Sequence, residues 1–457
     1  MTDADGASAL GRGYAPHLWL IVAVGALAAI SYGAGDQILR FLGGLSDTPT
    51  APVLALVVLF GCCSVASHYA TWKTPLPSFV VAIAMGIAGH TLFRPILSNP
   101  TLLSALVTAS AAIILFGGGL DMPLRDFLRL FVKIVLLAFP GVLISGFAFT
   151  IVAGAVGAWV GLGVASAVAI LLGAILASTD PAAIIPVVEH LRFKRRDTKD
   201  IVIAESALND VVGTLLTSAF LKLPLAVVTV GAAYASLASA ATLGFLGVQV
   251  GFGLLFGLIG FGLLWLLSRM KRRHSATFGA DQVYFVATPI LAFLGAAMFG
   301  GSGFLAAFVA GLVFHAEEHM GDIERFFGQV VDGVAKPIVF VLVGALVDVH
   351  SLIHYAAIGI PVALLFMFVL RPGMVFLVLG AYGFVRGPRG LSVRELLFIS
   401  FVRETGAIPA VLLVTAIARV TLPLPGLVEI GMWVILLTLL IAPPLTPLVA
   451  RKLGVAE

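Results

Sequence analysis

Apolar runs long enough to cross a lipid bilayer recur from one end of the chain to the other. A transmembrane helix needs about 20 predominantly apolar residues, and fourteen runs in this sequence reach about 17 or more. Only 11% of the 457 residues are charged, against about a quarter in soluble domains. The sequence therefore predicts an all-α, polytopic membrane protein of about 13–14 transmembrane helices. The predicted spans are residues 17–32, 52–72, 76–93, 100–120, 132–158, 163–188, 200–221, 242–268, 281–298, 302–317, 335–349, 357–385, 396–417 and 428–449.

Two stretches leave the number of helices open. The run from Leu18 to Ile30 is short and follows Arg12, as the apolar part of a signal peptide would. No small-residue cleavage motif ahead of a soluble segment comes after it, which favours a retained helix. The stretch from Leu223 to Leu243 is weakly apolar and rich in small residues, and it fits a loop, a half-helix or the beginning of the eighth span.

The basic residues indicate how the helices are oriented. Positively charged connections stay on the cytoplasmic side of a membrane, and with the N-terminus inside, most of the 27 Lys and Arg residues fall in inner connections. Both termini are therefore predicted to be cytoplasmic. The basic residues form short clusters between helices and not one amphipathic face, so nucleic acid is not an expected partner. The outer connections contain Arg40, Arg94, Lys222 and Arg419.

The positions of the spans indicate an internal duplication. The second to seventh spans and the ninth to fourteenth spans begin at positions that differ by about 228 residues throughout. One extra span lies between the two sets, so the second set enters the membrane from the opposite face, as in the inverted repeats of many transporters. The predicted segments are an extra helix with an outer loop at 1–50, a first six-helix repeat at 51–222, a linker helix at 223–275 and a second repeat at 276–457.

Helix-breaking residues fall at matching places in the two predicted repeats. Span six contains Thr179, Asp180 and Pro181 in succession, and span thirteen contains Gly406 and then Pro409. Proline removes a backbone donor and blocks the preceding turn, so each helix is expected to be interrupted near mid-membrane. The carbonyls and half-helix ends freed by such a break can hold ions. The alternative is a packing kink, which is common for prolines in membrane helices.

Four polar residues interrupt the apolar sequence of span seven: Glu205, Ser206, Asn209 and Asp210. Side chains four residues apart share a helix face, which pairs Glu205 with Asn209 and Ser206 with Asp210. Asp210 lies near the middle of the span, where a carboxylate is unfavourable unless a proton or a cation neutralises it. The sequence therefore predicts that protons and a cation compete at Asp210.

Two arginines also fall within predicted spans, where an unpaired charge costs several kcal/mol. Glu205 and Arg371 are each buried by prediction and are expected to form a structural ion pair. Arg403 and Glu404 lie about two turns into span thirteen. They fit three roles: pairing with each other, lining the inner vestibule, or gating it.

The sequence resembles the NhaP-like sodium/proton antiporters, a CPA1-type family of the cation:proton antiporter superfamily, over roughly residues 52 to 450. The two middle motifs are specific in combination, although each is short. The motifs that carry the resemblance are Thr179-Asp180-Pro181, Glu205-Ser206, Asn209-Asp210, Arg371-Pro372 and Gly406-Ala407-Ile408-Pro409.

This resemblance implies a homodimeric exchanger with the NhaA/NapA-like antiporter fold, in which crossed, discontinuous helices form a mobile core beside a dimer-forming scaffold. It implies that Asp210 is the main carboxylate for Na⁺ or K⁺ and for H⁺, with Thr179, Asp180 and Ser206 as further ligands. Asn209 would hold the crossing in register, and an Asn before the aspartate implies electroneutral exchange. The implied location is a bacterial inner membrane, and no cofactor is expected.

Two departures from the family pattern bear on ion choice and pH response. Many members have an acidic residue in the fourth span, where this chain has Gly117, Gly118 and Gly119, so that ligand or gate is predicted to be absent. Many members also have an arginine directly before the glycine of the last motif. Here Thr405 precedes that glycine, and Arg403 lies two residues earlier.

Other classes of function fit the sequence less well. The run from Gly33 to Asp36 matches a short pattern of intramembrane aspartyl proteases, but the Tyr-Asp dipeptide that they also need does not occur in the sequence. A cation channel could use buried carboxylates and broken helices, but it would not couple cation flow to protons. A transporter of organic anions would need basic groups where this chain is acidic. We therefore expect an antiporter and not an enzyme.

Overall fold

The computed structural model describes residues 5–44, 50–71, 78–179, 188, 191–274, 281–314, 320–386 and 391–457. Nine of the described helices are long and apolar enough to cross a membrane, or ten when the bent pair at 78–97 is counted as one span. Shorter apolar helices cover the remaining predicted spans, so each of the fourteen coincides with described helical residues. These shorter helices are Val57–Tyr69, Ser166–Leu176, Gly303–Val313 and Ala407–Arg419.

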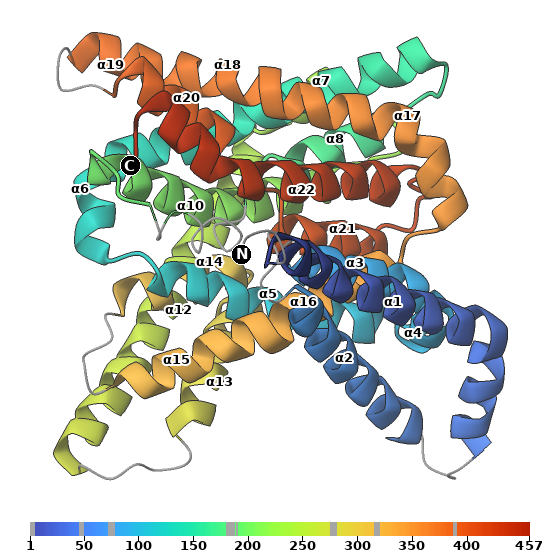
Figure 1. The fold of residues 1–457 in the computed structure, drawn as a ribbon. Coiled ribbons are helices and arrows are strands. Elements are labelled where there is room, and N and C mark those ends of the chain that lie inside the picture. Colours follow the sequence, from blue (N-terminus) through green and yellow to red (C-terminus); the bar gives the residue numbers. More distant parts are fainter. Residues whose placement is uncertain are drawn as a thin grey trace.

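Figure 1 shows the helices in two groups, one above the other. The lower group contains α1 (Asp5–Gly44), α2 (Thr50–Thr71), α3 (Ser78–Ala88), α4 (His90–Leu97), α5 (Pro100–Leu120), α12 (Ala240–His274), α13 (Asp281–Met298), α14 (Gly303–Val313), α15 (Gly321–Val330) and α16 (Lys336–Ala345). The upper group contains α6 (Leu124–Leu136), α7 (Val142–Val160), α8 (Ser166–Leu176), α10 (Arg196–Phe220), α17 (Val349–Leu365), α18 (Arg371–Val375), α19 (Ala381–Arg386), α20 (Val393–Phe401), α21 (Ala407–Arg419) and α22 (Leu427–Leu453).

Single π-helical turns interrupt three of the long helices. A π turn inserts one residue into the helical repeat, and such turns occur often beside functional sites. They are η1 (Leu137–Gly141) between α6 and α7, η3 (Val331–Ala335) between α15 and α16, and η4 (Phe366–Leu370) and η5 (Phe376–Gly380) on either side of α18.

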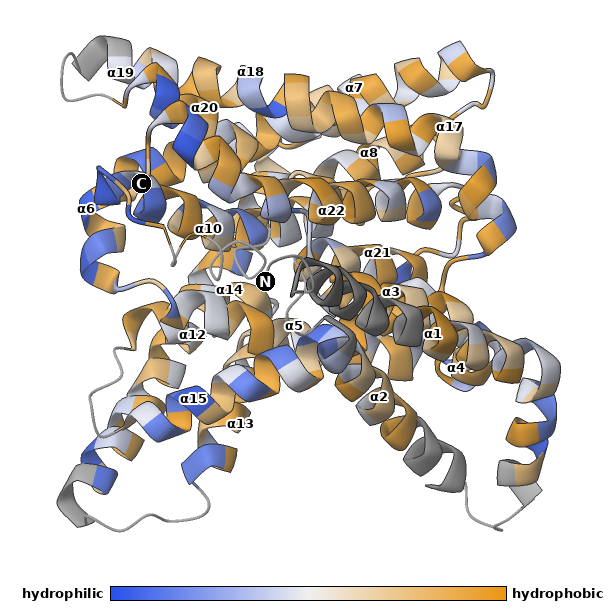
Figure 2. Cartoon of the chain, viewed as in Figure 1, coloured by the Kyte–Doolittle hydropathy of each residue, from blue (hydrophilic) through white to orange (hydrophobic). Residues whose placement is uncertain are grey.

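Hydrophobic residues cover most of the length of the helices in both groups, and hydrophilic residues gather at helix ends, including those near the C-terminus (Figure 2). Many large apolar side chains on the outside are exposed, such as Trp159, Leu258 and Phe368. Lipid chains contact such side chains without the penalty that water would impose. The chain is therefore an integral membrane protein.

Several predicted boundaries differ from the structure, and two of them show why. The eleventh span was placed at 335–349, but its helix begins at Gly321 and includes the charged residues Asp322 and Arg325. These charges make the first turns amphipathic, so an apolar-run criterion excludes them. The ambiguous stretch before the eighth span contains α11 (Val230–Ser236), a half-helix separate from α12.

Reciprocal glycine contacts hold α3 against α16 in the lower group. A Cβ atom at Gly86 would overlap the backbone carbonyl of Val341, and a Cβ at Gly344 would overlap that of Ile83. Two helices approach this closely only where neither carries a side chain at the contact. The contact therefore has no room for even a methyl group.

The same arrangement joins α5 to α14. A Cβ at Gly119 would overlap the carbonyl of Phe308, and a Cβ at Gly311 would overlap the carbonyl of Phe116. Gly119 belongs to the glycine triplet of the fourth span, where the resemblance implies an acidic residue in many members of the family. In this chain, that glycine makes a close helix contact.

The two glycine pairs repeat with a constant spacing in the sequence. Gly311 follows Gly86 by the same number of residues as Gly344 follows Gly119, about 225. Each contact joins a helix of the first half to a helix of the second, and the shift of about 225 residues relates α3 to α14 and α5 to α16. This correspondence is what an inverted duplication of the chain would produce.

Both predicted helix breaks can be located, with one correction to their cause. The helix α8 ends at Leu176, and an extended segment at 402–406 separates α20 from α21. Pro409 is the third residue of α21, so it follows the break and does not cause it. A proline in the first helical turn has no backbone donor to lose, which is why it is tolerated there. Pro181 lies outside the described residues.

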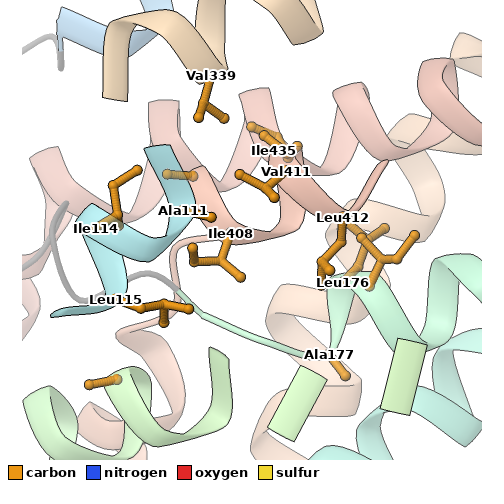
Figure 3. Close-up of a cluster of buried hydrophobic side chains, with 14 of the residues drawn as sticks. Ala111, Ile114, Leu115, Leu176, Ala177, Val339, Ile408, Val411, Leu412 and Ile435 are labelled. Atoms are coloured by element: carbon orange, nitrogen blue, oxygen red, sulfur yellow. The ribbon is translucent and has the colours of Figure 1, made fainter. Parts of the chain in front are cut away.

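Buried apolar side chains surround the second break (Figure 3). They come from α5, α16, α21, α22 and the end of α8, so α21 of the upper group packs against α5 and α16 of the lower group. Each is at most 9% exposed. The labelled members are Ala111, Ile114, Leu115, Leu176, Ala177, Val339, Ile408, Val411, Leu412 and Ile435.

Candidate functional site

The helix α10 carries four of the predicted site residues, Glu205, Ser206, Asn209 and Asp210. It is enclosed by other helices, because nearly all its residues from Ile201 to Phe220 are buried. Polar side chains within such a helix must find partners on neighbouring helices or one another. Glu205, Asn209 and Asp210 are each at most 2% exposed.

Asn209 joins α10 to the first helix break. Its Oδ1 accepts a hydrogen bond from the backbone N–H of Thr179 at 2.9 Å, and its Nδ2 donates to the Thr179 Oγ1 at 3.0 Å. The backbone N–H of Thr179 lies beyond the end of α8 and has no helical acceptor of its own. A side-chain amide that both accepts and donates fixes the position and the rotamer of this residue.

Ser206 lies on the neighbouring face of α10 and reaches the same threonine. Its hydroxyl donates to the Thr179 Oγ1 at 2.9 Å. The Thr179 oxygen therefore accepts from both Asn209 and Ser206, at the contact between α10 and the end of α8. Two of the predicted ligands, Thr179 and Ser206, are in direct contact.

Glu205 and Arg371 form a buried ion pair between α10 and α18. Arg371 Nη1 donates to Glu205 Oε1 at 3.0 Å, and Nη2 donates to Oε2 at 2.6 Å. Asn209 Nδ2 also donates to Oε1, at 2.6 Å. Two parallel bonds fit the fork of a guanidinium to a carboxylate, and this geometry is the favourable one for a buried pair. Hydrogen bonds thus run without a gap from Arg371 through Glu205 and Asn209 to Thr179.

Arg403 lies in the extended segment between α20 and α21 and contacts the end of α8. Its Nη2 donates to the carbonyls of Leu176 at 2.7 Å and of Ala177 at 3.1 Å. Its guanidinium also lies 3.9 Å from the ring centroid of Phe366, in the π turn η4. A positive charge at a helix C-terminus interacts favourably with the helix dipole. The second break therefore supplies the cap for the first half-helix.

Glu404 follows Arg403 and is equally buried, at 1% exposed. The described hydrogen bonds of Arg403 are to the end of α8; pairing with Glu404, lining the inner vestibule and gating stay predictions for this pair. Asp210 is one residue beyond Asn209 on α10 and 2% exposed. Asp180 lies outside the described residues, so its distance from Asp210 is not defined.

Sequence reasoning missed the contact that fixes the second helix break, which is made by Thr438 of α22. Its Oγ1 accepts a hydrogen bond from the backbone N–H of Thr405 at 3.1 Å, and both residues are fully buried. A threonine in an apolar helix has no distinctive pattern, so only its spacing from Asn209, close to the repeat offset, could have indicated it.

A polar contact at the start of α10 was also missed. Glu395, in the first turn of α20, accepts from Thr198 Oγ1 at 3.0 Å and from Arg195 Nη1 at 3.3 Å. It forms a capping box with Ser392. Burial alone would raise the pKa of Glu395, but the hydrogen bonds from Ser392 and Thr198 and the charge of Arg195 together lower this pKa below its ordinary value. The contact fixes the first turn of α10 to the helix that precedes the second break.

Comparison with known sequences identifies relatives of the chain. The family described as sodium/hydrogen exchanger, transmembrane, matches residues 53–452. The chain is 28% identical over 367 residues to the K(+)/H(+) antiporter NhaP of Alkalimonas amylolytica, covering 79% of this chain and 59% of that protein. It is 27% identical over 374 residues to the K(+)/H(+) antiporter NhaP2 of Shewanella sp. (strain MR-4), covering 80% and 61%. The chain thus spans about 60% of the length of these curated relatives.

The fold also has a counterpart among solved structures. The sodium proton antiporter MjNhaP1 of Methanocaldococcus jannaschii, solved at pH 8, superposes with a TM-score of 0.64 at 23% sequence identity. The superposition covers 86% of this chain and 99% of that one. The two proteins therefore share the antiporter fold. With nearly the whole sequence matched by the family, this chain belongs to the transmembrane sodium/hydrogen exchangers.

Proposed function

We propose that this protein is a secondary active antiporter that exchanges Na⁺ or K⁺ for H⁺ across a membrane. The observation that carries the proposal is the burial of Asp210 in α10, next to a polar network that ends at a broken helix. The family match and the relatives named as K⁺/H⁺ antiporters support it.

The proposed mechanism gives different roles to the two buried carboxylates of α10, Glu205 and Asp210. Glu205 is held by two hydrogen bonds from Arg371, whose positive charge compensates that of the carboxylate, so we assign Glu205 a structural role. Asp210 is the proposed carrier of either a proton or a cation. A carboxylate of this burial is unfavourable when it is bare, so a proton and a metal ion each neutralise it and each excludes the other.

The remaining ligands are proposed from their positions around Asp210. Ser206 lies one turn before it on α10, and Thr179 lies at the end of the first half-helix, in contact with Ser206. Oxygen ligands of this kind suit hard alkali cations. Asp180 is the proposed second carboxylate, and Asn209 holds Thr179 in place. We propose gating or structural roles for Arg403 and Glu404, and roles in forming the breaks for Pro181 and Gly406.

We propose alternating access by movement of one group of helices against the other. In this scheme the upper group, with its two broken helices, is the mobile core, and the lower group is the scaffold (Figure 1). The glycine contacts support a rigid scaffold, because they leave no space for its helices to slide. The repeats are proposed to be 51–222 and 276–457, joined by a linker at 223–275 and preceded by an extra helix within 1–50.

The proposed surroundings follow from the family and from the basic residues. We propose a homodimer that forms through the scaffold and lies in a bacterial inner membrane with both termini in the cytoplasm. The exposed basic residues Arg192, Lys194, Arg451 and Lys452 near the C-terminus support a cytoplasmic location for that end.

The test is cation-driven proton movement in liposomes. Purified protein is reconstituted with a pH-sensitive dye inside, and Na⁺, K⁺ or Li⁺ is added outside with and without an imposed voltage. We expect saturable proton efflux with one of these cations, at a rate that voltage does not change. A cation current without proton movement would favour a channel and would contradict the proposal. A rate that depends on voltage would contradict the electroneutral stoichiometry but not antiport itself.

A further inference from the structure

The two helix breaks are held in the same way by different residues. At the first break, the N–H of Thr179 donates to the Asn209 side chain on α10, the helix after the break. At the second, the N–H of Thr405 donates to the Thr438 side chain on α22, the helix of the span that follows the broken one, just as α10 follows the span of the first break. In sequence, Thr438 follows Asn209 by nearly the distance that separates Thr405 from Thr179, in line with the repeat offset.

The Thr438 hydroxyl is placed to act as an acceptor for this N–H. It donates its own proton within α22, where the carbonyls of Val434 and Ile435 lie at 2.9 and 3.0 Å. One lone pair of the oxygen is thereby directed toward the second break and takes the Thr405 N–H at 3.1 Å. Among the residues that the structure describes, the Thr405 hydroxyl has no hydrogen-bond partner, whereas its backbone N–H is held by Thr438.

The second break is linked to the first through Arg403. This residue is two positions before Thr405, and its guanidinium donates to the carbonyls of Leu176 and Ala177 at the end of α8. Thr179, with its contacts to Asn209 and Ser206, is two residues beyond Ala177. A shift of the segment around Thr405 would therefore move the guanidinium that caps α8, and with it the backbone that presents Thr179 to the ion site.

We propose that Thr438 is a positioning residue of the ion site: its hydroxyl fixes the second break as Asn209 fixes the first, and through Arg403 it sets where Thr179 lies. This inference rests on the proposed antiport function. It assigns a role to a residue on α22 that is distant in sequence from every predicted ligand.

The experiment compares Thr438→Val, which removes the acceptor at nearly constant volume, with Thr438→Ser, which restores it. The control is Thr446→Val on the same helix. Thr446 is also fully buried, but its hydroxyl bonds only within α22, to Ala442 at 2.8 Å. Leaving a buried N–H without a partner costs about 1–3 kcal/mol, so the half-saturating cation concentration of Thr438→Val should rise about fivefold or more.

We expect the maximal exchange rate of Thr438→Val per folded protein to change much less than its half-saturating cation concentration. Thr438→Ser and Thr446→Val should match the wild-type protein in both. Wild-type half-saturation in Thr438→Val, or an equal defect in Thr446→Val, would overturn the inference. If Thr438→Val does not fold, Thr438→Cys replaces it, because its thiol is only a weak acceptor. The half-saturating cation concentration of Thr438→Cys should rise by a smaller factor, and that of Thr438→Ser should not rise.

A second measurement does not depend on transport. Hydrogen–deuterium exchange followed by mass spectrometry should be faster in a peptide covering residues 402–406 of Thr438→Val than in Thr446→Val. Equal exchange in the two variants would overturn the positioning role even if transport changed. If the wild-type protein shows no cation-coupled proton movement, the proposed function fails, while this measurement still decides whether Thr438 holds the break.

Discussion

Arg371 donates to both carboxylate oxygens of Glu205, at 3.0 and 2.6 Å, and neither side chain is more than 2% exposed. Removing one partner leaves the other as an uncompensated charge, which costs about 3–5 kcal/mol in a buried pair. We therefore expect Glu205→Ala to lower the thermal unfolding temperature and the yield of folded protein, as measured by fluorescence-detected unfolding in detergent.

The matched control for this prediction is Asp332→Asn. Asp332 also pairs with a basic residue, Lys336, but its side chain is 58% exposed. Exposed pairs contribute about 0–1 kcal/mol, so the control should unfold near the wild-type temperature. A Glu205→Ala variant that is as stable as the control but inactive would instead assign Glu205 to transport.

Asp210→Asn tests the proposed ion site. The amide keeps the size of the side chain but cannot bind a proton or exchange it for a cation, so cation-dependent proton movement in liposomes should be abolished. Asp36→Asn, at an exposed carboxylate paired with Arg94, should retain wild-type exchange. Exchange that persists in Asp210→Asn, with the fold intact by gel filtration, would exclude Asp210 as the shared carboxylate.

The glycine contacts predict a position-dependent effect of adding one methyl group. Gly344→Ala places a Cβ against the carbonyl of Ile83, and helices packed this closely have to separate to accept it. We expect a loss of about 1–3 kcal/mol, seen as a lower unfolding temperature. Gly262→Ala, where no atom lies within 4 Å of the new Cβ, should be neutral or stabilising by up to about 1 kcal/mol. Equal stability in the two variants would contradict the packing described for α3 and α16.

The Glu395 contact predicts how stability depends on pH. Hydrogen bonds lower the pKa of Glu395 in the folded protein below its ordinary value of 4.5, so the unfolded chain binds this proton more readily. The contribution of Glu395 to stability is therefore present above pH 4.5 and is lost as the pH falls through the lowered folded-state pKa. The difference in unfolding temperature between wild-type protein and Glu395→Gln should be constant from about pH 8 to 5 and shrink below about 4.5.

The control for the pH series is Asp322→Asn, because Asp322 is 88% exposed and pairs with Arg325 only at 3.7 Å. We expect its unfolding temperature to follow that of the wild-type protein at every pH. A difference for Glu395→Gln that grows on acidification would mean that the contact with Thr198 and Arg195 does not stabilise the charged carboxylate.

Much of the fold and part of the site followed from the sequence because they depend on local rules. The bilayer requires apolar runs of a set length, so each predicted span coincides with described helical residues. The contact of Glu205 with Arg371 was predictable because each buried charge needs an opposite one, and few were available. Ser206 and Asn209 were placed correctly on neighbouring faces of α10 by helical periodicity alone.

The remaining contacts depend on how distant segments cross. Nothing near Arg403 in the sequence indicates that its guanidinium meets the carbonyls of Leu176 and Ala177, more than 200 residues earlier. The glycine run at the end of α5 was interpreted as a missing ligand, whereas Gly119 makes a helix contact that only the packed structure reveals. Thr438 was overlooked because a threonine bonded to its own helix is common in apolar helices.

The reciprocal glycine contacts also bear on how the protein is made. Gly86 meets Val341, and Gly119 meets Phe308, so α3 and α5 each pack against a helix that the ribosome supplies about 190–255 residues later. At roughly 5–20 residues per second, α3 and α5 remain in the bilayer for about 10–50 s before their partners are synthesised. During that time their bare glycine surfaces are open to lipid or to other proteins, so insertion factors that shield them would raise the yield of correctly assembled protein.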